Sequence, residues 1–384
     1  MKKLFGTLLV CVFMAVAVYI VVYSDVISNI FVKDINIESV YINELQLDNN
    51  TYYYSKLNDK EKRIYRVIAN GVMNLNKNMT VEVTRENSYE STKENVEVAL
   101  NAFFSDHPEV FYVNDQYEIS VLDFVAIKMI NLKLDYVSDD KKEIESMSDE
   151  MNIAIENINA RLTNAKTDYE KELLIHDIIA SETQYFEHND YKDIPNIKHT
   201  AYGALVQKSA VCDGITKAFQ IVLNKHNIES VFATGSTDGV AHAWCKVKLD
   251  DDYYNVDVTS NKTLDDINNK LVVHAYFNVT DKELMKSHVF DNYEKMPSAT
   301  ATKYNYYLYN DYTITYFDSF EYKLGQIIKS QNSKPLLEFS VSGISNVPDK
   351  IINSLYSLNF NNYKTNKITK MEYTKINDNY IIVK

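Results

Sequence analysis

The sequence is poor in several residue types, and each scarcity limits what the protein can be. Its 384 residues include only five prolines against 46% hydrophobic residues, which predicts packed domains rather than a disordered chain. Positive charge is also scarce, with 40 Lys and Arg against 53 Asp and Glu and a net charge of -13. The basic residues are dispersed among acids, whereas phosphate binding depends on clustered Lys and Arg. The composition therefore argues against a nucleic-acid-binding protein.

The longest apolar run lies at the N-terminus. Residues 4–23 carry no charge and are long enough to cross a bilayer as a helix, which predicts a transmembrane anchor over residues 1–24. A cleaved secretory signal is the alternative, because residues 15–17 resemble a small-x-small cleavage site. Lys2 and Lys3 precede the run, so the positive-inside tendency places the following domains outside the cytoplasm. The abundant Tyr, Ile, Asn and Lys are typical of an AT-rich bacterial genome.

The rest of the sequence divides into four parts by pattern. Residues 25–56 are polar and predict a stalk, and residues 57–165 predict an N-terminal α+β domain that ends in a charged connector helix. Residues 168–297 form a central domain, and residues 304–384 alternate strand and helix patterns in a C-terminal α+β module. The predicted fold class is α+β. The C-terminal module shows no polar cluster that indicates a site.

Cys212 stands out because the sequence uses only three cysteines. It opens the stretch "CDGITKAFQIVLNKH", in which apolar residues recur at the spacing of a buried helix stripe. Cys212 is thus predicted in the first turn of a helix, where unpaired backbone N–H groups and the positive end of the helix dipole favour a thiolate. Gly214 is expected to leave the backbone beside the sulfur unobstructed. A small buried hydrophobe is the alternative role for this cysteine.

A thiolate nucleophile needs a base that also returns a proton, and His242 is the best placed of the eight histidines. The segment "HAWCKVKL" predicts a strand, "DDD" a turn and "YYNVDV" a returning strand. A two-residue turn at 250–251 would pair His242 with Thr259 and make Asp257 its diagonal neighbour. A carboxylate there can fix the tautomer of the imidazole and stabilise the imidazolium.

Cys245 belongs to the same predicted strand, but alternation places it on the face opposite His242. A disulfide between Cys212 and Cys245 is the first alternative in an oxidising compartment, and it would require a side chain to cross the sheet. The same alternation argues against a metal site on His242 and Cys245, which also lacks adjacent ligand pairs. Cys245 is therefore predicted as a core residue, and Cys11 as a filler within the apolar run. We expect neither a metal nor a cofactor.

Three blocks resemble the signature blocks of the transglutaminase-like superfamily. They are "AYGALVQKSAVCDGITKAF", "HAWCKVKLDDDYYNVDVTS" and "AYFNVTDKELMKSH", within residues 168–297. The resemblance implies a core similar to that of papain-type cysteine peptidases, in which the cysteine opens a helix and the histidine and aspartate lie on the next strands of an antiparallel sheet. It implies Cys212 as the nucleophile, His242 as the general base and acid, and Asp257 as the residue that orients the histidine.

The sequence departs from the family pattern around these three residues. Ser209, Ala210 and Ile215 stand where a glycine and an aromatic are common, and Ser260 replaces an aromatic residue after the aspartate. These positions belong to the walls of the cleft, so they bear on the substrate more than on catalytic competence.

Several nearby residues have two interpretations. Tyr202 and Gln207 are candidates for an oxyanion donor that adds to the Cys212 backbone N–H, or they pack in the loop. Trp244 either lines the substrate cleft or packs behind it. We predict no chemistry for His176, His199 and His226, and His288 matches a position in the third block without an assigned role.

Two functions fit these features. The first is an extracytoplasmic thiol enzyme that transfers or hydrolyses acyl groups of protein or peptide amides, with cell-surface or peptidoglycan peptides as substrates. The second is a catalytically silent module that binds a cell-surface partner or acts as a scaffold. The complete Cys-His-Asp set favours the first, and the missing cleft aromatics favour the second.

Overall fold

The structure is a computed structural model. The residues that it describes are 51–83, 88–123, 128–187, 195–262, 271–334, 336–344, 347–358 and 373–383. The predicted membrane anchor and nearly all of the predicted stalk lie outside these residues. Within the described part of the chain, no helix is both long and apolar enough to cross a bilayer. The chain divides into two compact units, the first within residues 1–107 and 112–141 and the second within residues 108–111 and 142–384.

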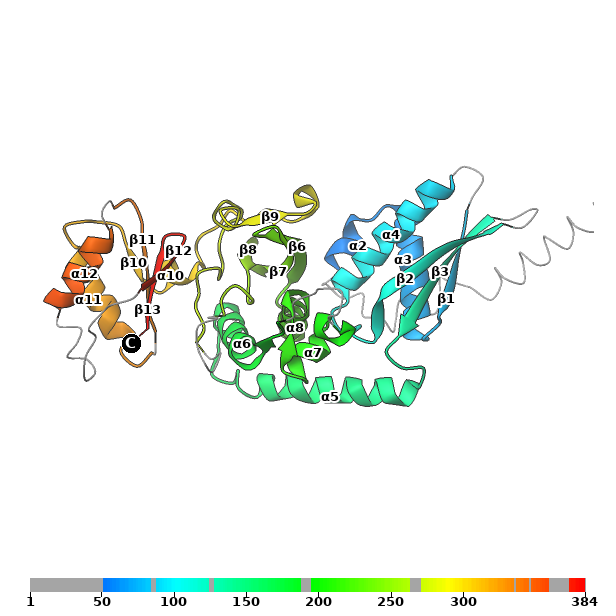
Figure 1. Cartoon of the computed structure of the whole chain (residues 1–384), viewed down its shortest axis with the longest axis horizontal. Helices are drawn as coiled ribbons and strands as arrows, with labels where there is room; N and C mark the ends of the chain where they lie inside the picture. The colour runs from blue at the N-terminus through cyan, green and yellow to red at the C-terminus, as the bar shows by residue number, and fades with distance from the viewer. Residues whose placement is uncertain are drawn as a thin grey trace, which may run out of the picture. The chain divides into compact units, whose positions relative to one another are not determined.

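Unit 1 is a three-stranded antiparallel sheet, of order β1-β3-β2, packed with helices (Figure 1). Its elements are α2 (Tyr52–Lys56), α3 (Asp59–Met73), β1 (Asn78–Glu82), α4 (Tyr89–Asp106), β2 (Val113–Asp123) and β3 (Lys128–Tyr136). A capping box between Asn58 and Glu61 begins α3. Helices α3 and α4 pack against each other and bury Ile68, Val72 and Phe103. Unit 1 therefore has its own hydrophobic core.

The central part of unit 2 contains an antiparallel sheet of order β8-β7-β6-β9. Its strands are β6 (Ser230–Thr237), β7 (Val240–Leu249), β8 (Asp252–Val256) and β9 (His288–Phe290). The hairpin of β7 and β8 has the predicted two-residue turn, with Leu249 opposite Asp252 and Asp250 in the left-handed region at φ 54°. Strands β6 and β9 were not predicted from the sequence, and they place the hairpin in a larger sheet.

Gly235 in β6 allows β9 and the Trp244 side chain to approach β6 closely. A Cβ atom at Gly235 would lie 1.9 Å from the backbone oxygen of Val289 in β9 and 2.8 Å from the ring of Trp244 in β7. Any side chain would therefore displace β9 or Trp244. Gly235 is also the residue opposite His242 in the pairing of β6 with β7.

Helices cover the central sheet (Figure 1). The helices of this part of unit 2 are α5 (Lys141–Asn159), α6 (Asp168–Glu182), η2 (Asn196–His199), α7 (Ala201–Leu205), α8 (Cys212–Lys225), α9 (Asp281–Leu284) and η3 (Tyr293–Lys295). Two short strands, β4 (Gln184–Tyr185) and β5 (Ser209–Ala210), pair with each other. Helix α8 contacts β6 and β7 as well as α6 and α7. Its position is thus fixed from several directions.

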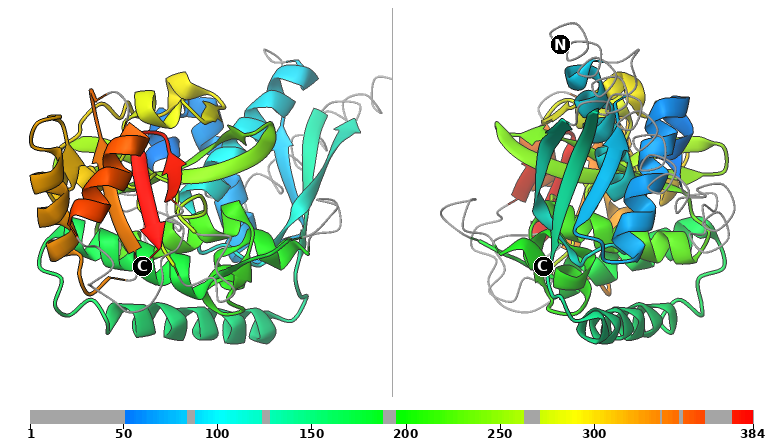
Figure 2. Two further views of the ribbon diagram at one scale, coloured as in Figure 1. Left: turned by 60° about the vertical axis from the view of Figure 1, so that its left-hand side comes forward. Right: turned by 90° about the vertical axis from the view of Figure 1, so that its right-hand side faces the viewer.

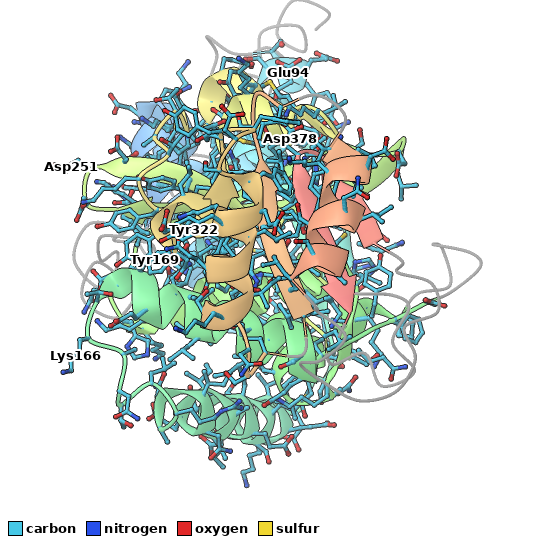
Figure 3. All side chains as sticks on the ribbon, turned by 90° about the vertical axis from the view of Figure 1, so that its left-hand side faces the viewer. Glu94, Lys166, Tyr169, Asp251, Tyr322 and Asp378 are labelled. Atoms are coloured by element: carbon cyan, nitrogen blue, oxygen red, sulfur yellow. The ribbon has the colours of Figure 1, made fainter. Side chains whose placement is uncertain are left out.

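The C-terminal module, residues 304–383 of unit 2, has a second four-stranded sheet of order β10-β11-β13-β12 (Figure 2). Its elements are α10 (Tyr306–Tyr309), β10 (Thr313–Ile314), α11 (Phe320–Ser330), β11 (Leu336–Val341), α12 (Val347–Ser357), β12 (Tyr373–Ile376) and β13 (Asn379–Val383). The module packs on the central part of unit 2, since Val273 shares a hydrophobic cluster with Leu336 and Ile381. Tyr169 of α6 is labelled in Figure 3. The centroid of its ring lies 4.0 Å from that of the Tyr309 ring in α10.

Candidate active site

Cys212 is the first residue of α8, as the apolar spacing after it predicted. The helix buries the predicted stripe of Ile215, Ala218, Phe219, Val222 and Leu223. No side chain caps the helix at Val211. The positive end of the helix dipole therefore acts on Cys212, whose side chain is only 9% exposed.

Gly214 has a different role from the one expected from the sequence. A Cβ atom there would lie 2.5 Å from the backbone oxygen of Lys198 and 2.9 Å from that of Thr200. The loop of η2 thus crosses directly over the start of α8, and the backbone N–H of Val211 donates to the same Lys198 oxygen at 3.0 Å. The space beside the cysteine backbone is filled by a second segment, so Gly214 fixes the loop in place rather than keeping the sulfur open.

His242 and Asp257 form a buried pair. The Nε2 atom of His242 lies 2.8 Å from Oδ2 of Asp257, and the Asp257 side chain is fully buried. The side chain of Cys212 also interacts with the His242 ring and raises its pKa. Burial lowers the pKa of His242, but the charge and hydrogen bond of Asp257 and the contact with Cys212 outweigh burial and raise this pKa to about 10. The three residues are therefore assembled around an imidazole that favours its protonated form.

The pairing that the sequence predicted for the end of the hairpin is wrong. β8 ends at Val256, so no pair forms between His242 and Thr259. Instead the backbone turns after Asp257, whose carbonyl accepts from the N–H of Asn261 at 3.2 Å, while Oδ1 of Asp257 accepts from the N–H of Ser260 at 2.9 Å. The carboxylate still reaches His242. Asp257 directly follows Val256, which pairs with Cys245 on the face opposite His242, so alternation gives Asp257 the same face as His242.

A second histidine, His288 at the start of β9, shares the same carboxylate oxygen. Its Nε2 lies 2.9 Å from Oδ2 of Asp257, and its Nδ1 lies 2.8 Å from the Ser287 hydroxyl. An ionised carboxylate only accepts, so both histidines donate to it. Burial raises the pKa of Asp257, but the charge and hydrogen bond of His242 and then those of His288 hold it well below its usual range. Sequence reasoning assigned no role to His288, and its place in the third block was the available signal.

The two predicted oxyanion candidates have other partners. The hydroxyl of Tyr202 in α7 donates to Glu150 of α5 at 2.5 Å, and its ring stacks on Phe111. Gln207 is exposed, and its side-chain oxygen accepts from Lys198 at 2.9 Å. These contacts correspond to the loop-packing interpretation of both residues. The backbone N–H of Cys212 stays the candidate donor at this end of α8.

Trp244 and Cys245 both lie in the protein interior. Trp244 is fully buried in a cluster with Ala233, Ala275 and Tyr276, and its indole N–H donates to Asn255 at 3.3 Å, which corresponds to packing behind His242 rather than to a cleft wall. Cys245 is buried and free, as is Cys212, so the two do not form a disulfide.

Cys245 lies on the face opposite His242, as strand alternation predicted, but that face is the one covered by α8. Its thiol donates to the backbone oxygen of Thr216 at 3.7 Å.

Two groups of side chains bring three potential metal ligands together within the described residues. One is His242, Asp257 and His288, and the other is His176, Asp177 and His274, with ligand atoms within 4.8 Å of one another in each group. In the first group, the contacts of 2.8 and 2.9 Å have the length of hydrogen bonds. Two other histidines for which we predicted no chemistry also have side-chain partners, since His199 contacts Asp213 at 3.0 Å and His226 contacts Asn159 of α5 at 2.9 Å.

Comparison with known proteins agrees with this arrangement. Residues 156–258 match the family model described as "Transglutaminase-like superfamily", a segment that includes Cys212, His242 and Asp257. This segment is therefore similar to the transglutaminase-like superfamily, and the predicted α+β class and family resemblance are confirmed. No curated protein matches the sequence.

Several solved structures match parts of the chain at low identity. A crystal structure of a TGase has 15% identity and a TM-score of 0.27, covering 37% of this chain and 44% of its own. A proposed cysteine protease from Cytophaga hutchinsonii has 12% identity and a TM-score of 0.25, and the match covers 46% of this chain and 66% of the protease. A proposed protease from Parabacteroides distasonis has 11% identity and a TM-score of 0.22, and the match covers 37% of this chain and 36% of the protease. The chain thus spans less than two thirds of the length of each.

Proposed function

We propose that this protein is an extracytoplasmic thiol enzyme that acts on protein or peptide amides through Cys212, His242 and Asp257. One observation carries the proposal. The buried carboxylate of Asp257 lies 2.8 Å from the ring of His242, and that ring also interacts with the side chain of Cys212 at the start of a helix. These are the contacts by which a nucleophile, a base and an orienting group act together.

The geometry supports a two-step acyl transfer. The Cys212 sulfur attacks the amide carbon, and the C–N bond breaks as the His242 imidazolium gives its proton to the leaving nitrogen, which leaves a thioester on Cys212. An amine or water then attacks the thioester, His242 takes the proton of the attacking group, and the thiolate leaves. Asp257 keeps a negative charge throughout and stabilises the imidazolium. The N-terminus of α8 supplies positive potential and the Cys212 N–H for the developing oxyanion.

Alkylation of Cys212 tests whether these residues act as a unit. We expect iodoacetamide to modify Cys212 readily at pH 6, because the positive charge of His242 lies beside the attacking sulfur, and the rate at pH 6 to fall at least tenfold in His242→Gln. The background is the labelling that remains in Cys212→Ser. Cys245 should contribute little, because its burial raises the pKa of that thiol far above the usual range. Equal rates in wild type and His242→Gln across the pH range would instead leave the catalytically silent binding or scaffold module as the function.

A labelled glutamine peptide separates the two outcomes of the thioester. Incorporation of an added primary amine into the peptide would identify a transferase, and release of ammonia or cleavage without incorporation would identify a hydrolase.

The location is a separate part of the proposal and is supported by the uncharged run of residues 4–23 that follows two lysines. We expect the full-length protein to stay in bacterial membranes after an alkaline wash and to be digested by protease added outside the cytoplasmic membrane. Deletion of residues 2–24 should abolish both. Release of a shortened protein into the medium would instead identify the run as a cleaved signal, and protection from external protease would contradict the extracytoplasmic location.

A further inference from the structure

A set of polar side chains connects the C-terminal module to the turn that follows Asp257. We call it the Glu338–Asn261 network, and its members in order are Glu338, His274, Asp177, His176 and Asn261. They come from β11, from the segment between residues 271 and 279, from α6 and from the turn after β8. All are buried except Asp177, whose side chain is 39% exposed. Polar groups at this depth need partners, and each of these five has them.

The C-terminal end of the network is a two-point contact. One oxygen of Glu338 accepts from the backbone N–H of His274 at 2.9 Å, and the other lies 2.9 Å from Nδ1 of the same residue. The His274 ring stacks on Tyr306 of α10 with centroids 3.8 Å apart. Gln331 in turn holds the backbone of Glu338 through bonds of 2.7 and 2.9 Å. The module therefore forms hydrogen bonds with both the backbone and the side chain of His274.

The centre of the network is an ionic arrangement. Asp177 Oδ1 lies 3.0 Å from Nε2 of His274 and 2.9 Å from Nδ1 of His176. Both ring nitrogens of His274 thus face carboxylate oxygens, which only accept, so both carry protons. Burial lowers the pKa of His274, but the charges and hydrogen bonds of Glu338 and Asp177 outweigh it and raise this pKa to about 9. His274 is a buried cation between two carboxylates from different parts of unit 2.

The other end of the network sets the turn that carries Asp257. The side-chain oxygen of Asn261 accepts from the backbone N–H of Tyr276 at 2.9 Å, so its amide nitrogen faces Nε2 of His176 at 3.0 Å. The backbone N–H of Asn261 donates to the Asp257 carbonyl, and the N–H of Asp257 donates to the Tyr276 carbonyl at 3.0 Å. Asn261 and Tyr276 therefore fix the backbone of Asp257 from both sides.

The same contacts decide against a metal ion at His176, Asp177 and His274. Because the Asn261 amide nitrogen donates to Nε2 of His176, the proton of the neutral ring is on Nδ1 and points to Asp177. Nδ1 is the atom of His176 that a metal would need. The cluster is thus a hydrogen-bonded network with its protons in place.

We propose that the C-terminal module positions Asp257 through the Glu338–Asn261 network, which makes the module part of the catalytic unit. Glu338, His274, Asp177, His176 and Asn261 are positioning residues, since they touch neither the nucleophile nor the substrate carbonyl. The inference rests on the proposed triad. Its physical basis is a pair of contacts. Segment 257–261 forms hydrogen bonds with segment 271–276, and Glu338 forms hydrogen bonds with the second segment.

The pKa of His242, measured by NMR on full-length protein with labelled histidine, reports the position of Asp257 without substrate or turnover. The His242→Gln variant identifies the signal. We expect Glu338→Gln and Asn261→Ala each to lower the His242 pKa by about one unit, because a carboxylate that is free to move away stabilises the imidazolium less. The double variant should show no larger shift than the greater single one, because both substitutions break the same connection.

Phe339→Leu is the matched control. Phe339 adjoins Glu338 on β11, is fully buried and stacks on Tyr380, so its truncation weakens the module without touching the network. The His242 pKa in Phe339→Leu should equal that of wild type, although this variant should lose about as much stability in urea as Glu338→Gln does. If Glu338→Gln does not fold, Glu338→Asp, which keeps the charge but shortens the reach, should give a smaller shift of the same sign.

Unchanged His242 pKa values in the folded Glu338 and Asn261 variants, additive shifts in the double variant, or an equal shift in Phe339→Leu would overturn the inference. Failure of the proposed function has a different signature. Slow Cys212 alkylation with a normal network response would reject the enzyme while the positioning role stands.

Discussion

Replacement of Asp257 by Asn is expected to lower kcat/KM for a glutamine peptide by about 10⁴-fold, the order of loss when a triad aspartate elsewhere becomes asparagine. The reason is the set of donors around the carboxylate. Oδ2 faces the N–H groups of His242 and His288, and Oδ1 faces the backbone N–H of Ser260. All three require an acceptor, and an amide offers one oxygen.

Either orientation of the new Asn side chain therefore fails at one end. With its oxygen toward the histidines, its NH₂ group meets the N–H of Ser260, and with its oxygen toward Ser260, its NH₂ group meets both imidazoles. The negative charge that raises the pKa of His242 is lost in both cases. The imidazolium form of His242 should then be scarcer at neutral pH.

Steady-state kinetics and the rate of Cys212 alkylation at pH 6 measure this effect, and circular dichroism verifies folding. Asp213→Asn is the matched control, because Asp213 adjoins Cys212 and pairs with His199 but does not contact the His242 ring in the arrangement described above. We expect its kcat/KM within tenfold of wild type. An Asp257→Asn enzyme that keeps a tenth or more of wild-type activity would show that His242 does not depend on the carboxylate.

The features of the site that the sequence predicted are encoded over short stretches. The apolar spacing from Ile215 to Leu223 places Cys212 at the start of a helix, and the alternating residues on either side of Asp250 produce the hairpin. Alternation also gives the face of Asp257. These arguments need only neighbours within one or two elements, so sequence reasoning was sufficient.

The features that were missed depend on residues far apart in the sequence or on strands without a pattern. β6 is buried on both faces, so Ser230–Thr237 lacks the polar-apolar alternation of a half-exposed strand. His176 reaches Asn261, and His274 reaches Glu338, only after α6, the hairpin and the C-terminal module pack together. The loop over Gly214 is likewise brought in by tertiary structure. In the sequence, His176 and His274 therefore resemble ordinary polar residues.

Glu172 on α6 leads to a prediction for stability. Its side chain is fully buried, and one oxygen accepts from the amide of Asn278 at 2.9 Å. The other oxygen has no hydrogen-bond partner among the described residues. Burial raises the pKa of Glu172 to about 8, although the Asn278 hydrogen bond acts in the opposite direction. The residue is therefore a neutral acid at pH 7 in the folded protein.

The sign of the pH effect follows from the two states. The unfolded chain releases the Glu172 proton near its ordinary pKa of 4.5, while the folded protein keeps it until about pH 8. The unfolded state thus binds fewer protons between these values, so the contribution of Glu172 to stability is largest below pH 4.5 and falls as the pH rises to 8. The full loss above pH 8 is on the order of 5 kcal/mol, at about 1.4 kcal/mol for each pKa unit of difference.

Glu172→Gln removes this proton and keeps the shape of the side chain. The free energy of unfolding in urea should therefore be nearly equal to that of wild type at pH 5 and higher by about 3 to 4 kcal/mol at pH 8. Glu187→Gln, an exposed substitution beyond the end of α6, should follow wild type at both values. Parallel pH curves for wild type and Glu172→Gln would mean that the acid ionises normally. Asn278 lies two residues after Tyr276, whose carbonyl accepts from the backbone N–H of Asp257. A charge that forms at Glu172, the partner of Asn278, would therefore act on the same backbone that positions the proposed triad.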